Sequence, residues 1–278
     1  MAGKTLRRKI DPARERWAGI VLAAGKGTRM KSSRAKVLHQ LGGRPMITYP
    51  IQALIDLGVH PIVCVVGHQA EKVRAALSGF SGLRFVRQFP QLGTAHAVGK
   101  ARALLRNFPG RIVILSGDVP LIRPALLKRF LNSHLRRRAG LSVLTTRVPD
   151  PRSYGRIVRD RTGRIARIVE NPDTDAQTRR IREINSGIYA ADPDFLFPLL
   201  AAVKKNPKKG EYYLTDVVGL AAARGRPAAA FPARDYRSVL GINTREELIE
   251  AEAIRRRQAL GPLRAEPAKK RTNPRRKG

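Results

Sequence analysis

The sequence predicts an α/β protein built on a doubly wound, mostly parallel sheet. Through residues 19–145, short apolar runs rich in β-branched side chains alternate with segments of helical periodicity. That alternation is typical of parallel βα units. Further along, two short strand-like runs, 155–159 and 165–170, flank residues 160–163, which predicts a β-hairpin. The expected architecture is therefore Rossmann-like, with an inserted β subregion.

The first half of the chain supplies most of the predicted parallel sheet. Gly19–Leu22 is an apolar, β-branched run that suits a buried strand. The remaining elements follow from short apolar runs bounded by turn residues, which predict strands, and from apolar residues at helical spacing, which predict helices. On these grounds we expect strands at 61–66, 83–86, 111–115 and 141–145, and helices at 46–57, 70–77, 94–105 and 124–138.

The second half is less regular. Beyond the hairpin we expect strands at 183–189 and 228–231, and helices at 195–202, 214–224 and 244–257. Asn243 or Thr244 would be the N-cap of the last helix. Since no repeat or linker interrupts residues 18–260, the sequence predicts one domain at 17–260, a basic N-terminal tail at 1–16 and a basic, disordered C-terminal tail at 261–278.

The charge of the chain is strongly positive. Lys and Arg number 55 against 21 Asp and Glu, a net charge of +34. Much of this excess lies in the middle of the chain rather than at its ends. Such a field attracts acidic substrates, nucleic acids and anionic surfaces alike. A polyanion-binding or RNA-binding protein is therefore an alternative of a different class. Aromatic residues make up only 5% and no zinc-ligand spacing occurs, so nucleic acid is expected to bind at most nonspecifically.

The cysteine count and the hydropathy of the sequence indicate the cellular compartment of the protein. The single cysteine, Cys64, falls inside the apolar run 61–66 and is expected to be a small core residue. Since one cysteine cannot form a disulfide within the chain, the sequence favours the reducing cytoplasm. No apolar run approaches the ~18 residues of a membrane span, and no hydrophobic segment follows the N-terminal charges. We therefore expect neither a membrane anchor nor secretion.

The first strand leads into the loop Gly25-Lys26-Gly27-Thr28-Arg29, and Lys36 follows shortly after. Two glycines let the backbone turn sharply and approach a ligand, and the basic residues suit a phosphate ester. The spacing excludes a P-loop, and Met30 stands where the dinucleotide fingerprint needs its third glycine. By itself, the loop fits an ordinary strand-to-helix turn equally well.

This loop is the first of eight segments that resemble, in the same order, the sugar-1-phosphate nucleotidyltransferases. The segments are Leu22-Ala-Ala-Gly-x-Gly-Thr-Arg-Met, Gln88-x-x-Gln-Leu-Gly-Thr, Gly117-Asp-Val-Pro-Leu, Tyr154-Gly-Arg-Ile, Ile168-Val-Glu, Glu183-Ile-Asn-Ser-Gly, Gly210-Glu-Tyr-Tyr-Leu-Thr-Asp and Gly241-Ile-Asn. The resemblance runs from about residue 18 to 257. It is strongest to the uridyltransferase domains of bifunctional N-acetylglucosamine-1-phosphate uridyltransferases/glucosamine-1-phosphate acetyltransferases. It implies the nucleotide-diphospho-sugar transferase form of the fold.

The resemblance also implies a reaction. UMP would pass from UTP to N-acetylglucosamine 1-phosphate, giving pyrophosphate and UDP-N-acetylglucosamine, a cell wall precursor. Arg29 and Lys36 would be catalytic, neutralising charge as pyrophosphate departs. Asp118 and Asn243 would hold Mg²⁺ through their oxygens. Without the resemblance, Asp118 also fits a turn residue at a strand end. No general base is expected, because the nucleophile is already an anion, and none of the five histidines needs a role.

Binding residues carry over in the same way. The nucleotide would lie against Leu22, Ala23, Ala24, Gly25, Gly27, Gln88, Gly93 and Thr94, and the sugar against Gly155, Glu170 and Asn185. The Gln88 amide, which both donates and accepts, would pair with the N3–H and O4 edge of uracil. Glu170 would accept hydrogen bonds from sugar hydroxyls, while Asn185 and the backbone of Gly155 would lie near the N-acetyl group.

Some positions depart from the family pattern. Ala35 replaces the proline before the family lysine, Ser116 replaces an aromatic residue, and Ala95 replaces a glycine. Asn171-Pro172 follows Glu170 where a basic residue is more common. Another sugar 1-phosphate, or another base such as thymidine or cytidine, therefore stays open as an alternative. No hexapeptide repeat occurs in the sequence, so we expect neither acetyltransferase activity nor the trimer that such repeats form.

Overall fold

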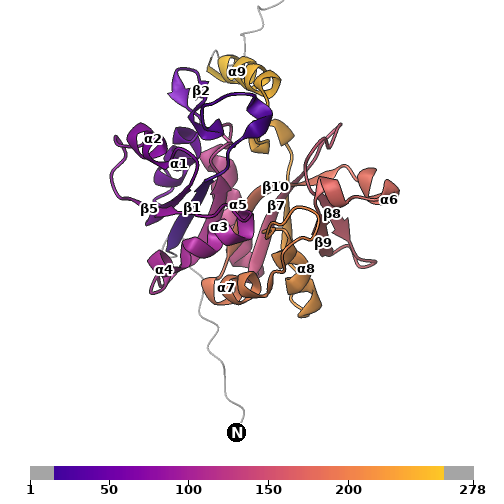
Figure 1. The fold of residues 1–278 in the computed structure, drawn as a ribbon. Coiled ribbons are helices and arrows are strands. Elements are labelled where there is room, and N and C mark those ends of the chain that lie inside the picture. The colour runs from indigo at the N-terminus through magenta and orange to yellow at the C-terminus, as the bar shows by residue number, and fades with distance from the viewer. Residues whose placement is uncertain (1–15, 260–278) are drawn as a thin grey trace, which may run out of the picture.

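The computed structural model describes residues 16–259, and a nine-stranded sheet forms its centre (Figure 1). Seven strands follow the order β11-β7-β10-β6-β1-β4-β5, and the β8–β9 hairpin joins this sheet through β10. The strands are β1 (Trp17–Ala23), β4 (Ile62–Val66), β5 (Leu83–Arg87), β6 (Arg111–Ser116), β7 (Leu141–Arg147), β8 (Arg156–Arg159), β9 (Ile165–Val169), β10 (Glu183–Ala191) and β11 (Ala229–Ala233).

Four of the six strand pairs along the seven-strand path are parallel. β1 lies between β4 and β6 and is parallel to both, with Val21 opposite Cys64 on one side and Leu115 on the other. β5 adds to β4, and β11 adds to β7, in the same sense. β10 runs antiparallel to β6 and β7 and also pairs with β8 of the hairpin. The predicted doubly wound, mostly parallel sheet with an inserted β subregion is confirmed.

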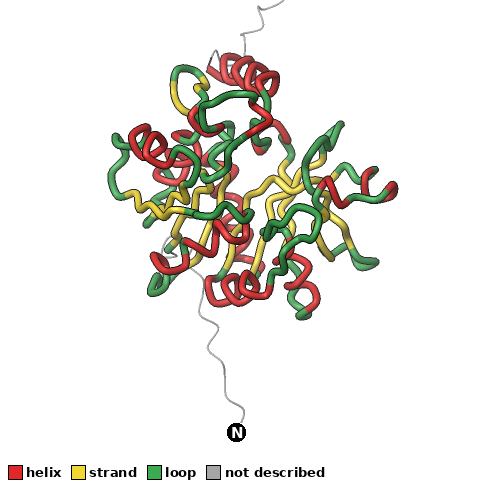
Figure 2. The backbone as a smooth tube through the Cα atoms, in the orientation of Figure 1, coloured by secondary structure: helices red, strands yellow, loops and turns green. Residues whose placement is uncertain are grey.

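Helices cover both faces of the sheet (Figure 2). Successive side chains of a strand point to opposite faces, so Val21 packs with the helices of one face and Ile20 with those of the other. The first face carries α1 (Thr48–Ile55), α2 (Ala70–Ala76) and α5 (Pro124–Arg137), and the second carries α3 (Thr94–Lys100), α4 (Arg102–Leu105), α7 (Pro193–Ala202) and α8 (Asp216–Ala223).

The last helix, α9 (Arg245–Ala259), packs away from the sheet. It lies near a small hairpin formed by β2 (Gln40–Leu41) and β3 (Arg44–Pro45), at the top of Figure 1. A separate apolar cluster holds it there, formed by Leu41, Met46, Leu121, Ile242 and Ala251. Since Ile242 belongs to the segment just before the helix, this cluster fixes the position of that segment too.

Several short elements differ from the sequence predictions. The helix expected at 94–105 is divided at Ala101 into α3 and α4. The two-residue strands β2 and β3 and the one-turn helix α6 (Ala176–Arg179) were not predicted, and neither were four 3₁₀ turns, η1 (Thr28–Met30), η2 (Lys36–Leu38), η3 (Asn171–Asp173) and η4 (Tyr236–Val239). Elements this short leave no periodic signal in the sequence.

Cys64 is a buried core residue, as predicted, and burial raises the pKa of its thiol to about 12. None of the helices in the described part of the chain is both long enough and apolar enough to cross a membrane. The predicted tails at 1–16 and 261–278 lie outside the described residues, apart from Arg16.

Candidate active site

Two adjoining cavities lie at the edge of the sheet where the parallel strands β1 and β6 end. The larger has a volume of about 530 Å³ and is lined by Lys36 and by every residue predicted to bind nucleotide: Leu22, Ala23, Ala24, Gly25, Gly27, Gln88, Gly93 and Thr94. The smaller, of about 170 Å³, is lined by Arg29, Asn243 and the predicted sugar residues Gly155, Glu170 and Asn185. Ser116 and Asp118 line both. The carboxyl edge of an open α/β sheet is where ligands bind in such folds.

The loop after β1 is shaped by its two glycines. A Cβ on Gly25 would meet no atom within 4 Å, so this residue faces open space. Gly27 has a φ of 69°, and a Cβ there would lie 2.4 Å from the Cβ of Lys36. Glycine at this position therefore permits both the left-handed turn and the close packing of the loop against Lys36.

Gln69 fixes the segment that leads to Lys36. Its Oε1 accepts a hydrogen bond from the backbone N–H of Ala35 at 2.9 Å, and its Nε2 donates to the carbonyl of Ser33 at 2.7 Å. Proline, the usual family residue at position 35, has no N–H to donate. The departure at Ala35 thus adds a contact that holds Lys36 in place.

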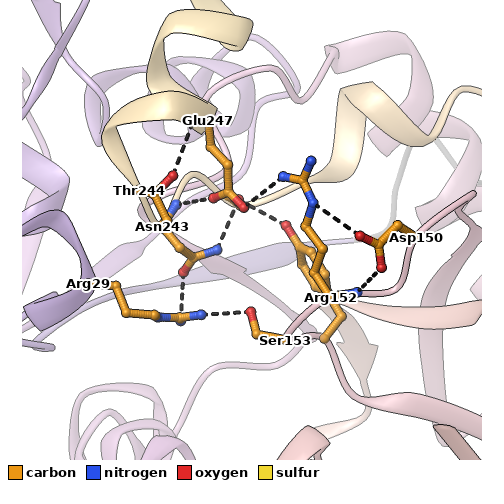
Figure 3. A network of polar contacts seen from close by, with 9 residues as sticks. Arg29, Asp150, Arg152, Ser153, Asn243, Thr244 and Glu247 are labelled. Atoms are coloured by element: carbon orange, nitrogen blue, oxygen red, sulfur yellow. Dashed lines mark hydrogen bonds and ion pairs between the residues drawn. The ribbon is translucent and has the colours of Figure 1, made fainter.

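Positive side chains surround the point where the cavities meet. Lys36 Nζ donates to Oδ2 of Asp118 and, at 3.0 Å, to Oδ1 of Asn243. Arg29 donates to the same Asn243 oxygen at 2.9 Å and to Oγ of Ser153 at 2.7 Å (Figure 3). Burial alone would raise the pKa of Asp118, but the charge of Lys36 and hydrogen bonds from Lys36 and Ser116 outweigh it and lower that pKa. Asp118 is therefore a carboxylate at neutral pH.

The Asn243 amide is available to this cluster because another residue caps α9. Thr244 Oγ accepts the backbone N–H of Glu247 at 3.2 Å, the contact of a helix N-cap. Of the two caps considered from the sequence, the structure thus favours Thr244. The backbone N–H of Ile242 donates to the carbonyl of Asp118 at 2.8 Å, which holds the Asn243 segment against the end of β6.

The oxygens of Asp118 and Asn243 fit a divalent cation. Both converge on one positive group, the Lys36 ammonium, and a carboxylate with an amide oxygen is a donor pair that Mg²⁺ accepts. Among the described residues, no three His, Cys, Asp or Glu side chains form a metal-binding group. An ion here would therefore take its other oxygens from substrate or water, which is the usual way Mg²⁺ binds.

Gln88 lines the larger cavity. Its Nε2 donates to the carbonyl of Gly93 at 2.9 Å and lies 3.2 Å from Nδ1 of His96. Burial and the charge of Lys100 lower the pKa of His96, so its ring is neutral at pH 7 and can accept from Gln88. Both contacts use Nε2, and neither uses the amide oxygen of Gln88.

The smaller cavity contains a half-buried carboxylate, that of Glu170. Thr215 Oγ donates to Oε1 of Glu170 at 3.0 Å. Burial, aided by the charges of Asp216 and Asp173, raises the pKa of Glu170 above its ordinary value. Asn185 lies beside it, where β10 has a bulge. The Asn185 amide accepts the N–H of Gly187 at 3.0 Å and donates to the hydroxyl of Tyr189 at 2.7 Å.

Sequence reasoning missed several of these polar residues. Gln91 stands in a segment already singled out, and its Nε2 donates to the carbonyl of Ala24 at 2.6 Å, so the spacing Gln88-x-x-Gln could have pointed to it. Ser153 and Gln69 have no such signal, because their partners lie far away in sequence.

A doubly wound sheet whose carboxyl edge joins a glycine loop to an Asp–Lys–Asn cluster defines a nucleotide-handling protein of the α/β class. A family model described as nucleotidyl transferase matches residues 18–251. The chain therefore belongs to the nucleotidyl transferase family.

Comparison with curated proteins shows which members of the nucleotidyl transferase family this chain is similar to. The chain is 48% identical over 237 residues to the bifunctional protein GlmU of Geotalea daltonii, and 46% identical over 241 residues to that of Geobacter metallireducens. These alignments cover 85% and 87% of this chain but only 52% and 51% of the relatives. The chain thus spans about half the length of the curated relatives it matches. The resemblance to the sugar-1-phosphate nucleotidyltransferases is confirmed.

Solved structures share the fold. A proposed glucose-1-phosphate thymidylyltransferase from Bacillus anthracis superimposes with a TM-score of 0.68 at 22% identity, covering 86% of this chain and 95% of that one. A UDP-glucose pyrophosphorylase complexed with UDP-glucose gives 0.70 at 20% identity, covering 88% and 99%. At these identities the likeness shows the fold.

Proposed function

We propose that this protein transfers UMP from UTP to N-acetylglucosamine 1-phosphate, giving UDP-N-acetylglucosamine and pyrophosphate. The observation that carries the proposal is the junction of the two cavities at Asp118, surrounded by Lys36, Arg29 and Asn243. One cavity suits the nucleotide and the other the sugar phosphate, so the reacting phosphates would meet at this cluster. The similarity to GlmU proteins supports the choice of substrates.

In this reaction a phosphate oxygen of the sugar phosphate attacks the α-phosphorus of UTP. The bond from that phosphorus to the bridging oxygen breaks, and pyrophosphate leaves with the electron pair. The nucleophile is already an anion, so the protein has to position the groups in line and neutralise charge. Lys36 would do so from the nucleotide cavity and Arg29 from the sugar cavity.

Asp118 and Asn243 would hold Mg²⁺, which when bound supplies positive charge to phosphate oxygens. The Gln88 oxygen would accept the N3–H of uracil. Glu170 would accept a sugar hydroxyl, with Asn185 and the Gly155 backbone near the N-acetyl group. We also place the reaction in the cytoplasm, which the single, buried Cys64 supports.

The test is a substrate matrix on the full chain with Mg²⁺. UTP, CTP, TTP and ATP are each combined with N-acetylglucosamine 1-phosphate, glucosamine 1-phosphate and glucose 1-phosphate, and pyrophosphate release is followed. UTP with N-acetylglucosamine 1-phosphate should give the highest kcat/KM, by about tenfold or more over each other pair. A higher value for another pair would replace the proposed substrates. Release from none of them would reject the activity.

A further inference from the structure

Asn243 belongs to a ring of polar contacts that also includes Glu247, Arg152, Ser153 and Arg29 (Figure 3). Glu247, in the first turn of α9, accepts two hydrogen bonds through its carboxylate. The backbone N–H of Asn243 donates to Oε2 at 2.6 Å, and NH1 of Arg152 donates to Oε1 at 3.2 Å. A single side chain thus joins Asn243 to the loop that precedes β8.

The ring closes through the sugar cavity. Ser153 follows Arg152 in the chain and accepts from Arg29, which also donates to the Asn243 amide oxygen. Tyr154 adds a parallel contact, because its hydroxyl donates to the carbonyl of Gly241 at 2.9 Å. The segment carrying Asn243 and the loop carrying Ser153 and Tyr154 are therefore held together from both sides.

Arg152 is held in an uncommon conformation. Its φ is 43°, a left-handed value that bulky residues adopt only where their surroundings determine it. Those surroundings are visible: its N–H donates to Oδ1 of Asp150 at 3.0 Å, and its carbonyl accepts from Arg156 at 3.1 Å. These two contacts hold the loop backbone from which the Arg152 side chain reaches Glu247.

We propose that Glu247 and Arg152 are positioning residues that orient Asn243 and couple the metal position to the sugar cavity. The inference rests on the proposed function. Contacts behind a metal ligand fix its orientation, and their loss typically weakens metal binding or activity. Here the coupled partner is the loop 150–155, which borders the sugar cavity through Ser153, Tyr154 and Gly155.

A purely structural role would look different. Glu247 lies in the capped first turn of α9, so its loss could lower stability without touching substrate or metal binding. A suitable readout is the gain in affinity for UDP-N-acetylglucosamine that Mg²⁺ produces. This ratio compares one folded protein with and without the ion, so a general loss of stability leaves it unchanged.

The experiment measures this gain by calorimetry on the full chain, with and without Mg²⁺, for Glu247→Ala, Glu247→Gln, Arg152→Ala and the matched control Glu250→Ala. Glu250 is an acidic residue one turn further along α9, and its charge also helps to raise the pKa of Arg152. Glu247→Ala should reduce the Mg²⁺ gain by about tenfold. Glu247→Gln should retain more of it, because its amide oxygen can still accept the Asn243 N–H. Glu250→Ala should match the wild type.

Kinetics should show the same coupling. In Glu247→Ala and Arg152→Ala, the KM for N-acetylglucosamine 1-phosphate should rise several-fold, while the KM for UTP stays within about twofold, since Gln88 and Gly93 are untouched. If Glu247→Ala does not fold, Arg152→Ala serves as the second variant. The Arg152 side chain is 49% exposed, so removing it leaves no cavity in the core.

A wild-type Mg²⁺ gain that persists in Glu247→Ala and Arg152→Ala would overturn the inference and leave the proposed function intact. A wild type whose affinity does not respond to Mg²⁺ would also overturn it. If the wild type neither binds nor forms UDP-N-acetylglucosamine, the proposed function itself fails, and the inference fails with it.

Discussion

At the residue scale, the hydrogen bonds that a polar side chain makes within the protein decide which of its atoms remain to bind a substrate. The sequence suggested that the Gln88 amide both donates to and accepts from uracil. In the structure its Nε2 is held by Gly93 and His96, so under the proposed function the oxygen is the atom that would accept from the base. Uracil carries a hydrogen on N3 and cytosine does not, so an acceptor here favours UTP.

Replacing Gln88 by Ala should therefore remove base discrimination. We expect kcat/KM for UTP to fall by about tenfold or more, the value of one buried hydrogen bond, with little change for CTP. Steady-state kinetics with both nucleotides measure this directly, and CTP is the internal control. An equal loss for both nucleotides would mean that Gln88 supports the loop rather than the base.

A substitution at Glu170 should change substrate binding without lowering the stability of the fold. Because its folded-state pKa is raised by burial and by Asp216 and Asp173, the ionised form costs stability at pH values above that pKa. Glu170→Gln removes this charge and keeps an oxygen for Thr215, so Tm at pH 7.5 should not fall. The KM for the sugar phosphate should rise by about tenfold, because a charged acceptor is lost.

The wild-type pH profile provides the check. The KM for the sugar phosphate should rise as pH falls through a value above 4.5, the ordinary pKa of this group, and the profile of Glu170→Gln should lack this step. A lower Tm together with an unchanged KM in the variant would contradict the assignment.

At the element scale, one backbone position joins the two loops that form the base end of the cavity. Gly93 has a φ of 97°, and a Cβ there would lie 2.6 Å from the carbonyl oxygen of Tyr212. Tyr212 in turn pairs with the start of α3: its N–H donates to Leu92 at 2.8 Å, and its carbonyl accepts from Ala95 at 2.9 Å. The loop over α3 can approach this closely only if position 93 has no side chain.

Gly93→Ala and Gly99→Ala should therefore have opposite effects on stability, although both lie at α3. The first forces a side chain into backbone at a left-handed φ and should cost about 1–3 kcal/mol, with a higher KM for UTP. The second lies within the helix, where a Cβ would meet nothing within 4 Å, and should gain up to about 1 kcal/mol. The free energy of unfolding of each variant, measured by denaturant unfolding, tests this prediction. Equal effects would contradict the packing argument.

The elements that the sequence predicted are those with a strong local signal. The strands β1, β4 and β6 are largely apolar runs that are mostly buried between two helical layers, so period and composition agree. The division of 94–105 at Ala101 was not predictable, because apolar spacing continues across it. The direction of β10 also could not be predicted, since antiparallel pairing with β6 and β7 depends on partners distant in sequence.

At the scale of the whole molecule, charge is unevenly distributed. The chain carries +34, yet Glu170 has acidic neighbours: its pKa is raised by burial and by the charges of Asp216, Asp173 and Glu211. Basic residues lie instead at the junction of the cavities, where phosphates would bind.

Because of its large positive net charge, the protein should bind polyanions without selectivity. RNA affinity of the full chain should fall steeply with salt, by at least about tenfold between 50 and 200 mM, as counterion release requires. Over the same range, kcat/KM should change much less, because the substrates bind through a few built contacts. RNA affinity that is sequence-selective and survives high salt, with no sugar-nucleotide synthesis, would favour the alternative of a nucleic-acid-binding protein.

The positions predicted for the site share two adjoining cavities, because the eight matching segments end at one edge of the sheet. The hydrogen bonds that hold these residues in position could not be predicted from the sequence. Arg29 and Ser153 are 124 residues apart and Arg152 and Glu247 are 95 apart, and polar pairs at such separations leave no pattern in a single sequence. The resemblance thus predicted the reacting groups, and the structure shows the contacts that their side chains make.

The most direct test of the account is the rate of Mg²⁺-dependent UDP-N-acetylglucosamine synthesis by Asp118→Asn in the full chain. Asp118 lines both cavities and contacts Lys36, so its charge should be essential to a single site formed by the two. The account predicts that kcat falls by about 100-fold or more, equivalent to roughly 3 kcal/mol of transition-state stabilisation, in a protein that remains folded by circular dichroism. A kcat near that of the wild type, with unchanged dependence on Mg²⁺, would contradict it.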